Sequence, residues 1–219
     1  MPPRSMRKDE YLISEIFFSI TGEGMFAGKP AIFVRFGECN LDCSFCDTPF
    51  RTNPTVCTIE QICTRIKLAE PSSFPISYRP PVVLTGGEPL FAMRHSSSLF
   101  QALRMLGREI HIETNGTFCP SWFKPRLRRH AFITCSPKKG RAISRALYPA
   151  IHVMKILMDK DGQLSHPLPR GLITPYVFIQ PITYTNPNDT RKATQYAISF
   201  VKQHGLRLSV QIHKYLGIR

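Results

Sequence analysis

The sequence has no long apolar run and few acidic residues. No stretch approaches the about 18 consecutive apolar residues that a membrane-spanning helix requires. The first ten residues, MPPRSMRKDE, also lack the apolar core of a signal peptide. These absences argue against a membrane or exported protein, and we expect a soluble, cytoplasmic one. No internal repeat or low-complexity segment stands out either.

The shortage of acidic residues leaves a large positive charge. Only 15 Asp and Glu stand against 29 Lys and Arg, a formal charge of +14, which favours anionic partners. A nucleic-acid-binding protein usually gathers such charge on one face or motif, whereas here it is spread in short groups. We interpret it as solvated surface and predict no direct contact with nucleic acid. The groups are Arg4, Arg7 and Lys8; Arg126, Arg128 and Arg129; and Lys138, Lys139 and Arg141.

Cysteine is present but in an odd number, seven, and a reducing cytosol does not support a disulfide framework. Cys57, Cys63, Cys119 and Cys135 are distant in sequence from the other three and are interpreted as small buried thiols. With 219 residues, 42% of them hydrophobic, the chain can bury a sizeable core. We predict one domain over residues 1–219.

Short apolar runs alternate with amphipathic segments along the chain. Their length and β-branched content predict buried strands at 31–36, 82–84, 109–113, 131–134, 151–157, 176–179 and 207–212. Helices are predicted from a cap at Thr58 to about residue 66, over 96–106 and over 189–205. Strands that alternate with helices imply right-handed crossovers and a mainly parallel sheet. The predicted fold class is therefore α/β.

Polar segments follow most of these predicted strands. A cysteine loop follows the first, TGGEP (85–89) the second, TNG (114–116) the third, SPKK (136–139) the fourth, QPI (180–182) the sixth and HKY (213–215) the last. Ligands and catalytic groups of parallel α/β folds lie at the carboxyl ends of the strands. We therefore expect these segments to converge on one pocket.

The loop GECNLDCSFCDTPF (37–50) carries Cys39, Cys43 and Cys46 with the spacing Cys-x3-Cys-x2-Cys. Three thiolates can hold three irons of a [4Fe-4S] cluster, which leaves the fourth iron open for a substrate or cofactor. The alternative is zinc, with Cys57 or a histidine as fourth ligand. Zinc ribbons and fingers usually have a second half site, which is absent here, so the spacing favours iron and sulfur.

The cysteine spacing with Phe45 before the last cysteine, followed downstream by GGEP, resembles the signature of radical S-adenosylmethionine enzymes. Most of the chain is similar to the 7-carboxy-7-deazaguanine synthase family, through SITGEGMFAGKPAIFVRFGECNLDCSFCDT (19–48), TGGEPL, IETNGT, SPK, QPI and LSVQIHKYLGI. The resemblance implies a partial (β/α) barrel of mainly parallel strands, of the radical SAM type. It also implies a lyase of queuosine and deazapurine biosynthesis. Such an enzyme converts 6-carboxy-5,6,7,8-tetrahydropterin to 7-carboxy-7-deazaguanine by radical ring contraction with loss of ammonia.

The same resemblance implies two cofactors that share the cysteine loop. A [4Fe-4S] cluster is expected on Cys39, Cys43 and Cys46, and S-adenosyl-L-methionine is expected to chelate its open iron and to be cleaved to a 5′-deoxyadenosyl radical. Glu88 matches a position that accepts the cofactor's ammonium, and glycine lets the backbone approach a ligand closely. The cofactor-binding residues implied are Phe45, Cys46, Asp47, Gly87, Glu88, Ser136, Pro137, Lys138 and Gln180.

On the substrate side, Arg35 matches the family's substrate arginine. A guanidinium grips a carboxylate through two parallel hydrogen bonds, and an arginine in an apolar strand otherwise lacks a rationale, because an unpaired buried charge is costly. Thr48 matches a Mg²⁺ ligand of the family, although its hydroxyl could instead cap a turn, and Asp47 could compete for the metal. The substrate-binding residues implied are Ile20, Thr21, Gly22, Arg35 and Thr85, with Glu23 close by.

Four further residues at strand ends have two interpretations each. His213 and Lys214 either close the pocket or lie on its solvated rim. Glu113 and Asn115 either cap a following helix or contact the cofactor.

The family also implies a flavodoxin or ferredoxin as electron donor and a homodimer. Two other functions stay open at this point. One is a glycyl-radical-enzyme activase of the same superfamily, against which the SITGEG and QIHKYLGI segments argue. The other is a non-catalytic zinc-binding RNA protein, suggested by the basic charge.

Overall fold

Nine strands form one curved sheet in the computed structural model, which describes residues 7–74, 78–124, 128–168 and 176–218. Their order is β3-β1-β2-β4-β5-β6-β7-β8-β9, so the sheet has two free edges and is not closed into a full barrel. The strands are β1 (Glu10–Ile20), β2 (Pro30–Phe36), β3 (Thr55–Thr58), β4 (Val82–Gly86), β5 (Ile110–Thr114), β6 (Phe132–Cys135), β7 (Val153–Met158), β8 (Tyr176–Pro181) and β9 (Arg207–Leu208).

The strands β2, β4, β5, β6, β7, β8 and β9 pair parallel in that order. The strand β1 pairs antiparallel with both β2 and β3. The carboxyl ends of the parallel strands therefore meet at one edge of the sheet, and the register sets their residues side by side. Arg35 on β2 lies opposite Thr85 on β4, and Leu157 on β7 lies opposite Gln180 on β8. The mainly parallel α/β sheet predicted from the sequence is confirmed.

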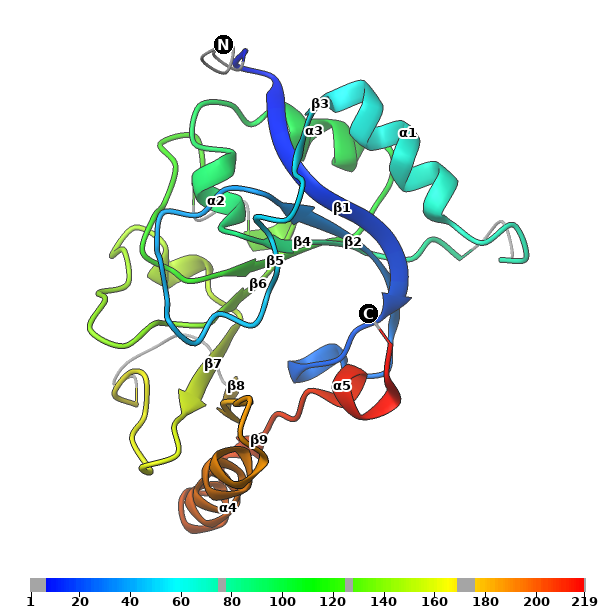
Figure 1. The fold of residues 1–219 in the computed structure, drawn as a ribbon. Coiled ribbons are helices and arrows are strands. Elements are labelled where there is room, and N and C mark those ends of the chain that lie inside the picture. Colours follow the sequence, from blue (N-terminus) through cyan, green and yellow to red (C-terminus); the bar gives the residue numbers. More distant parts are fainter. Residues whose placement is uncertain (1–6, 75–77, 125–127, 169–175, 219) are drawn as a thin grey trace.

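The helices α1, α3 and α4 cover the convex side of the sheet (Figure 1). The helix α1 packs against β1, β3 and α3, and α4 packs against β7, β8 and β9 at the other end. The capping box predicted at Thr58 is present, since its hydroxyl accepts the N–H of Gln61 at 3.3 Å and the Gln61 side chain accepts the N–H of Thr58 at 2.8 Å. The helices are α1 (Ile59–Ala69), α2 (Pro89–Ala92), α3 (Ser98–Met105), α4 (Pro187–His204) and α5 (Ile212–Leu216), with short 3-10 turns η1 (Gly24–Phe26) and η3 (Tyr148–Ala150).

The last predicted strand, 207–212, is wrong in length. Only β9 (Arg207–Leu208) is extended, and the chain then leaves the sheet because the N–H of Ile212 bonds to the carbonyl of Gly22 at 2.9 Å. Ile212 starts α5, so HKY lies in a helix and not in a loop after a strand. The C-terminal helix α5 therefore lies against the segment between β1 and β2, as Figure 1 shows.

Two strands were not predicted from the apolar pattern. The strand β1 mixes polar and apolar residues along its length, and β3 has only one buried residue, Cys57. In the described ranges no helix is both long and apolar enough to cross a membrane. Arg4 and Arg126, members of two of the basic groups, lie outside the described residues.

Candidate active site

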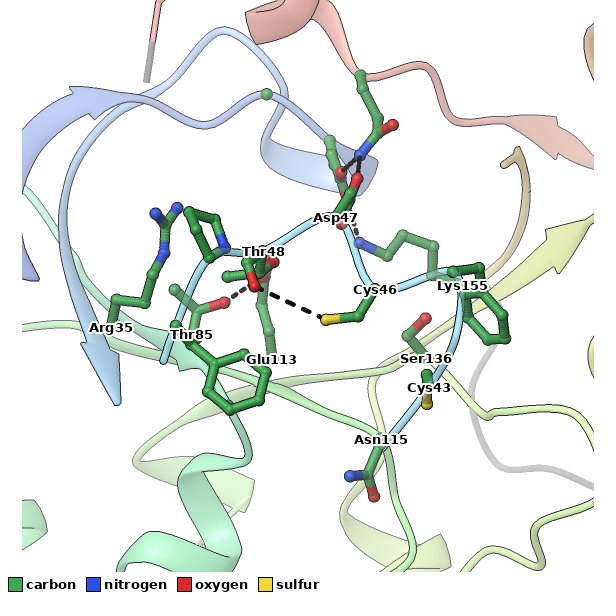
Figure 2. Close-up of a pocket in the computed structure, with 18 of the residues that line it drawn as sticks. Arg35, Cys43, Cys46, Asp47, Thr48, Thr85, Glu113, Asn115, Ser136 and Lys155 are labelled. Atoms are coloured by element: carbon green, nitrogen blue, oxygen red, sulfur yellow. Dashed lines mark hydrogen bonds and ion pairs between the residues drawn. The ribbon is translucent and has the colours of Figure 1, made fainter. Parts of the chain in front are cut away.

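A cavity of about 470 Å³ lies where the parallel strands end, as the order of polar segments predicted. Most of the residues proposed for the site border it, from six strand ends, the cysteine loop and the C-terminal segment. They are Ile20, Thr21, Gly22, Arg35, Cys39, Cys43, Phe45, Cys46, Asp47, Thr48, Thr85, Gly87, Glu113, Asn115, Ser136, Lys138, Gln180, His213 and Lys214. Figure 2 shows ten residues of this cavity with labels.

Two of the predicted cofactor residues, Glu88 and Pro137, do not border the cavity. Glu88 is fully buried behind it, where its carboxylate accepts the Thr114 hydroxyl at 2.7 Å and the N–H groups of Asn115 and Leu90 at 2.6 and 3.1 Å. Burial raises the pKa of Glu88 to about 7 despite these donors. In this structure the carboxylate fastens GGEP to the TNG segment, and a contact with the cofactor stays a prediction.

The three cysteines of the loop are free thiols on the wall of the cavity. The loop turns between them, because the N–H of Cys46 bonds to the carbonyl of Cys43 at 3.1 Å. The Sγ atom of Cys46 lies 3.8 Å from the carbonyl oxygen of Thr48, as Figure 2 shows. Burial raises the pKa of Cys39 and Cys43. Within the described ranges, no group of three His, Cys, Asp or Glu side chains is arranged to hold a metal ion.

The GGEP turn approaches the start of the cysteine loop so closely that a side chain does not fit. A Cβ on Gly87 would lie 2.0 Å from the carbonyl oxygen of Glu38. That oxygen accepts the N–H of Glu88 at 2.8 Å, and the Glu38 side chain forms an ion pair with Arg94 at 2.8 Å. Gly86 has φ +98°, a conformation that glycine adopts without strain. These contacts fix the backbone next to Cys39.

A second set of hydrogen bonds joins the cysteine loop to the segment after β5. Asn115 donates to the side-chain oxygen of Asn40 at 3.1 Å, and Asn40 donates to the hydroxyl of Thr117 at 2.9 Å. The side-chain oxygen of Asn115 accepts the N–H of Thr117 at 2.8 Å. Asn115 thus holds a turn beside the cysteine loop. Asn115 was also suggested to cap a following helix, but residues 115–124 form turns, bends and irregular segments and no helix.

Two buried polar atoms on the substrate side have no hydrogen-bond partner among the described residues. They are Nε of Arg35 and the hydroxyl of Thr21. The Arg35 guanidinium forms an ion pair with Glu15 through Nη1 and lies 5.2 Å from the centre of the Phe17 ring, while its Nε has no partner among the described residues. Because an unsatisfied buried donor is costly, these two atoms indicate a site for a polar ligand.

Further along the wall, Thr85 donates to Glu113 at 2.8 Å, which holds that carboxylate at the end of β5 (Figure 2). Lys138 donates to the hydroxyl of Ser136 at 3.1 Å, and burial lowers the pKa of its ammonium. Gln180 is buried, and its side-chain oxygen accepts the hydroxyl of Ser209 at 2.7 Å.

The C-terminal segment closes one side of the cavity. His213 packs so tightly on Gly22 that a Cβ there would lie 1.9 Å from its Nδ1 atom. Lys214 donates to Asp47 at 2.6 Å. Burial opposes the charge of Asp47, but bonds from Lys214 and Gln211 hold its pKa below the usual range. His213 thus packs against the wall of the cavity, whereas Lys214 is exposed at its edge, and both interpretations of the pair stay predictions.

Lys155 and Gln211 are two of the cavity residues that were not predicted from the sequence. Lys155 lies in β7, which is buried along its whole length, and pairs there with Glu23. Burial acts to lower the pKa of Lys155, but the nearby carboxylates outweigh it and raise the pKa. The argument used for Arg35, a cation in an apolar strand, applies equally to VMKILM and could have found Lys155. Gln211 carried no such signal.

No family model matches the chain. A 7-carboxy-7-deazaguanine synthase from Rickettsia prowazekii (strain Madrid E) is 35% identical over 221 residues, which are 94% of this chain and 88% of that protein. One from Bacteroides thetaiotaomicron is 35% identical over 208 residues, which are 94% of this chain and 98% of that protein. The crystal structure of QueE from Escherichia coli has a TM-score of 0.65 and 24% identity, and covers 95% of this chain and 99% of that one. The similarity to the QueE structure confirms the predicted α/β fold class.

Proposed function

The chain belongs to the 7-carboxy-7-deazaguanine synthase family, and we infer that it is a radical S-adenosylmethionine enzyme. It converts 6-carboxy-5,6,7,8-tetrahydropterin to 7-carboxy-7-deazaguanine by ring contraction with loss of ammonia, a step of queuosine and deazapurine biosynthesis. One observation carries this conclusion: the three free thiols of one loop, the glycines of GGEP and Arg35 border a single cavity.

The residues fit a [4Fe-4S] cluster and S-adenosylmethionine by their chemistry. Thiolates are the usual ligands of iron–sulfur clusters, and no disulfide consumes Cys39, Cys43 or Cys46. The close approach of Gly87 to Glu38 supports a backbone cradle beside the first of these cysteines. When bound, the cluster supplies the electron for reductive cleavage of the cofactor, and the protein supplies binding, orientation and exclusion of side reactions.

The roles of the polar wall follow from the groups that it presents. Phe45 and Asp47 of the cysteine loop, Ser136 and Lys138 after β6, and Gln180 on β8 hold the cofactor. The ammonium of Lys138 is a suitable partner for a carboxylate, because burial strengthens a charge-assisted hydrogen bond. Glu88 and Pro137 support this wall from behind it.

Substrate is held by residues at the ends of β1, β2 and β4. Arg35 binds the carboxylate of the pterin through the side that Glu15 leaves open, and the Thr21 hydroxyl bonds to the ring edge. Ile20 and Gly22 form the adjoining wall. Thr85 orients Glu113 toward the cavity, so that this carboxylate is fixed before substrate enters. Orientation of this kind favours the reaction because the geometry is set in advance.

Mg²⁺ is part of the proposal through Thr48, which borders the cavity next to Asp47. Mg²⁺ keeps several waters and needs only one or two protein oxygens, and the substrate carboxylate supplies a further one.

The partners proposed are a flavodoxin or ferredoxin, as donor of the electron, and a second copy of the chain in a homodimer. A reduced electron carrier and an oxygen-sensitive cluster both suit the cytoplasm, where we propose that the enzyme works. The activase and the zinc-binding RNA protein are not favoured, because synthases of one family match 94% of the chain.

The function is tested by anaerobic reconstitution with iron and sulfide, followed by reduction and incubation with S-adenosylmethionine, Mg²⁺ and carboxytetrahydropterin. The wild-type protein is expected to show the visible absorption of an iron–sulfur cluster and to form the deazapurine, detected by mass. Cys43→Ala should lose both signals, and Cys63→Ala, which changes a thiol of α1 away from the cavity, is the matched control that keeps them. A colourless protein with bound zinc would contradict the proposal.

A further inference from the structure

Four charged side chains and one amide form a connected network on the side of the cavity closed by the C-terminal segment. Lys155 and Glu23 form a buried ion pair, and Asp47 and Lys214 form a second pair at 2.6 Å. Gln211 lies between the two pairs, because it bonds to a carboxylate of each. Its amide nitrogen donates to Glu23 Oε1 at 2.5 Å and to Asp47 Oδ2 at 2.9 Å.

The orientation of the Gln211 amide follows from its neighbours. Carboxylates only accept hydrogen bonds, so the NH₂ group faces Glu23 and Asp47. The amide oxygen accepts the Thr183 hydroxyl at 2.6 Å and the Lys214 ammonium at 2.7 Å. Reversal of the amide would place its oxygen against two carboxylates. The side chain therefore has one stable orientation.

The network joins parts of the cavity that are distant in sequence. Glu23 follows the substrate-side residues at the end of β1, and Asp47 follows the last cysteine of the loop. Lys155 belongs to β7, all of whose residues are buried, and its side chain is 8% exposed. Gln211 and Lys214 belong to the segment that covers the opening. The positions of the two carboxylates thus depend on the ammonium groups of Lys155 and Lys214 and on the amide of Gln211.

The charges of the network balance only as a set. Lys155 and Lys214 offset Glu23 and Asp47, and the pKa of Glu23 is held low because Lys155 outweighs the effect of burial. Without Lys155, Glu23 would lose its buried partner, and the cations left near the two carboxylates would be Lys214 and Lys138. Breaking a buried pair by removing one partner is strongly unfavourable, because it leaves an uncompensated charge.

We propose that Lys155 and Gln211 are positioning residues for the reaction, which set the substrate-side loop at Glu23 and the cysteine loop at Asp47 in a fixed relation to each other. The inference rests on the proposed function. Neither residue needs to touch the reacting atoms. Their effect is to hold the substrate and the cofactor at the distance that the radical step requires, where a displacement of about 1 Å lowers the rate about 100-fold.

The experiment compares Lys155→Met, Gln211→Glu and the charge-balanced double variant Lys155→Met/Glu23→Gln with the wild type. Gln211→Glu keeps the shape of the side chain and places a third carboxylate between the other two. Lys160→Met is the matched control, because it removes a lysine that pairs with Asp189 at 3.1 Å outside the cavity. Thermal unfolding, the Kd of carboxytetrahydropterin with S-adenosylmethionine present, and 5′-deoxyadenosine released per product are measured for each.

Both single variants are expected to lower kcat/KM about 100-fold and to release several molecules of 5′-deoxyadenosine per product, and the control to stay within about threefold. The double variant should regain the thermal stability lost in Lys155→Met but not the coupling of cleavage to product. If it also regains coupling, Lys155 only balances a buried charge and the inference fails. Should Lys155→Met not fold, Gln211→Glu and the double variant decide.

The outcome separates this inference from the proposed function. A wild-type protein that binds carboxytetrahydropterin and does not convert it overturns the proposed function. The Kd of the pterin in the single variants then tests the inference. Single variants that bind the pterin within threefold of the wild type, with unchanged coupling, overturn the inference alone. A wild-type protein that does not bind the pterin overturns both.

Discussion

Replacement of Gly87 by alanine tests the contact between GGEP and the cysteine loop most severely. The new Cβ would lie 2.0 Å from the carbonyl oxygen of Glu38, 2.5 Å from its carbonyl carbon and 3.1 Å from the nitrogen of Cys39. Comfortable contacts lie at about 3.5 Å, so the two segments must separate by about 1 Å or more. All three neighbours are backbone atoms, and rotation of a side chain does not relieve the clash.

The cost of Gly87→Ala can be worked out from these contacts. Overpacking costs about 1–3 kcal/mol, and loss of the 2.8 Å bond from the N–H of Glu88 to Glu38 adds about 1 kcal/mol. We therefore expect a loss of about 2–4 kcal/mol in the free energy of unfolding. Since Cys39 follows Glu38 directly, the first ligand of the proposed cluster moves as well. Iron content should fall, and kcat/KM should fall about 100-fold.

Gly107→Ala is the matched control for Gly87→Ala. Gly107 has φ +67°, a Cβ there meets nothing within 4 Å, and the residue ends α3 away from the cavity. Its replacement costs about 1 kcal/mol through backbone strain alone and should leave iron content and kcat/KM unchanged. Both variants are reconstituted anaerobically and compared by iron analysis, thermal unfolding and kinetics. If Gly87→Ala keeps the iron content and kcat/KM of the wild type, the cradle beside Cys39 has no role.

Three further changes test single residues. Arg35→Ala should raise the KM for the carboxylated pterin about 30-fold, because about 2 kcal/mol of charge-assisted bonding is lost. Cofactor cleavage without substrate should be unchanged. Equal losses in pterin binding and in cofactor cleavage would make Arg35 a structural residue. The pKa of Glu88 is raised from 4.5 to about 7, so the folded protein without its cluster binds this proton more tightly than the unfolded chain does. The free energy of unfolding should therefore fall by about 3 kcal/mol as the pH rises from about 4.5 to about 7. Glu88→Gln should flatten this part of the stability curve, and an identical slope in both proteins would place the titration elsewhere. Thr48→Val should raise the Mg²⁺ concentration needed for half-maximal activity while cluster absorption is kept; an unchanged Mg²⁺ dependence would leave Thr48 as a turn residue.

The strands and helices with regular apolar patterns were predicted well. The capping box at Thr58, the strand β2 and the strands β4 to β8 follow from local propensity and burial, which the sequence displays directly. The strand β1 was missed because polar residues interrupt its apolar ones and most of its residues are only partly buried. The end of β9 depends on a bond from Ile212 to Gly22, a contact across the whole chain.

The candidate site was predictable where chemistry-bearing residues follow strands. The cysteine loop and Arg35 border the cavity as expected, because parallel strands deliver their carboxyl ends to one edge. The burial of Glu88 could not be foreseen, since it depends on Thr114 and Asn115 of another strand end. Gln211 was missed for a similar reason, because its position between Glu23 and Asp47 is set only by the tertiary fold.

In the proposed enzyme, three cysteines hold a cluster whose remaining iron binds the cofactor. The most direct measurement is electron–nuclear double resonance on the reduced, reconstituted protein with S-adenosylmethionine that carries ¹⁵N in its methionine amino group. A hyperfine coupling between the label and the cluster is predicted, and it should vanish in Cys43→Ala together with the cluster signal. A cluster spectrum that is unchanged by the bound, labelled cofactor would contradict the account.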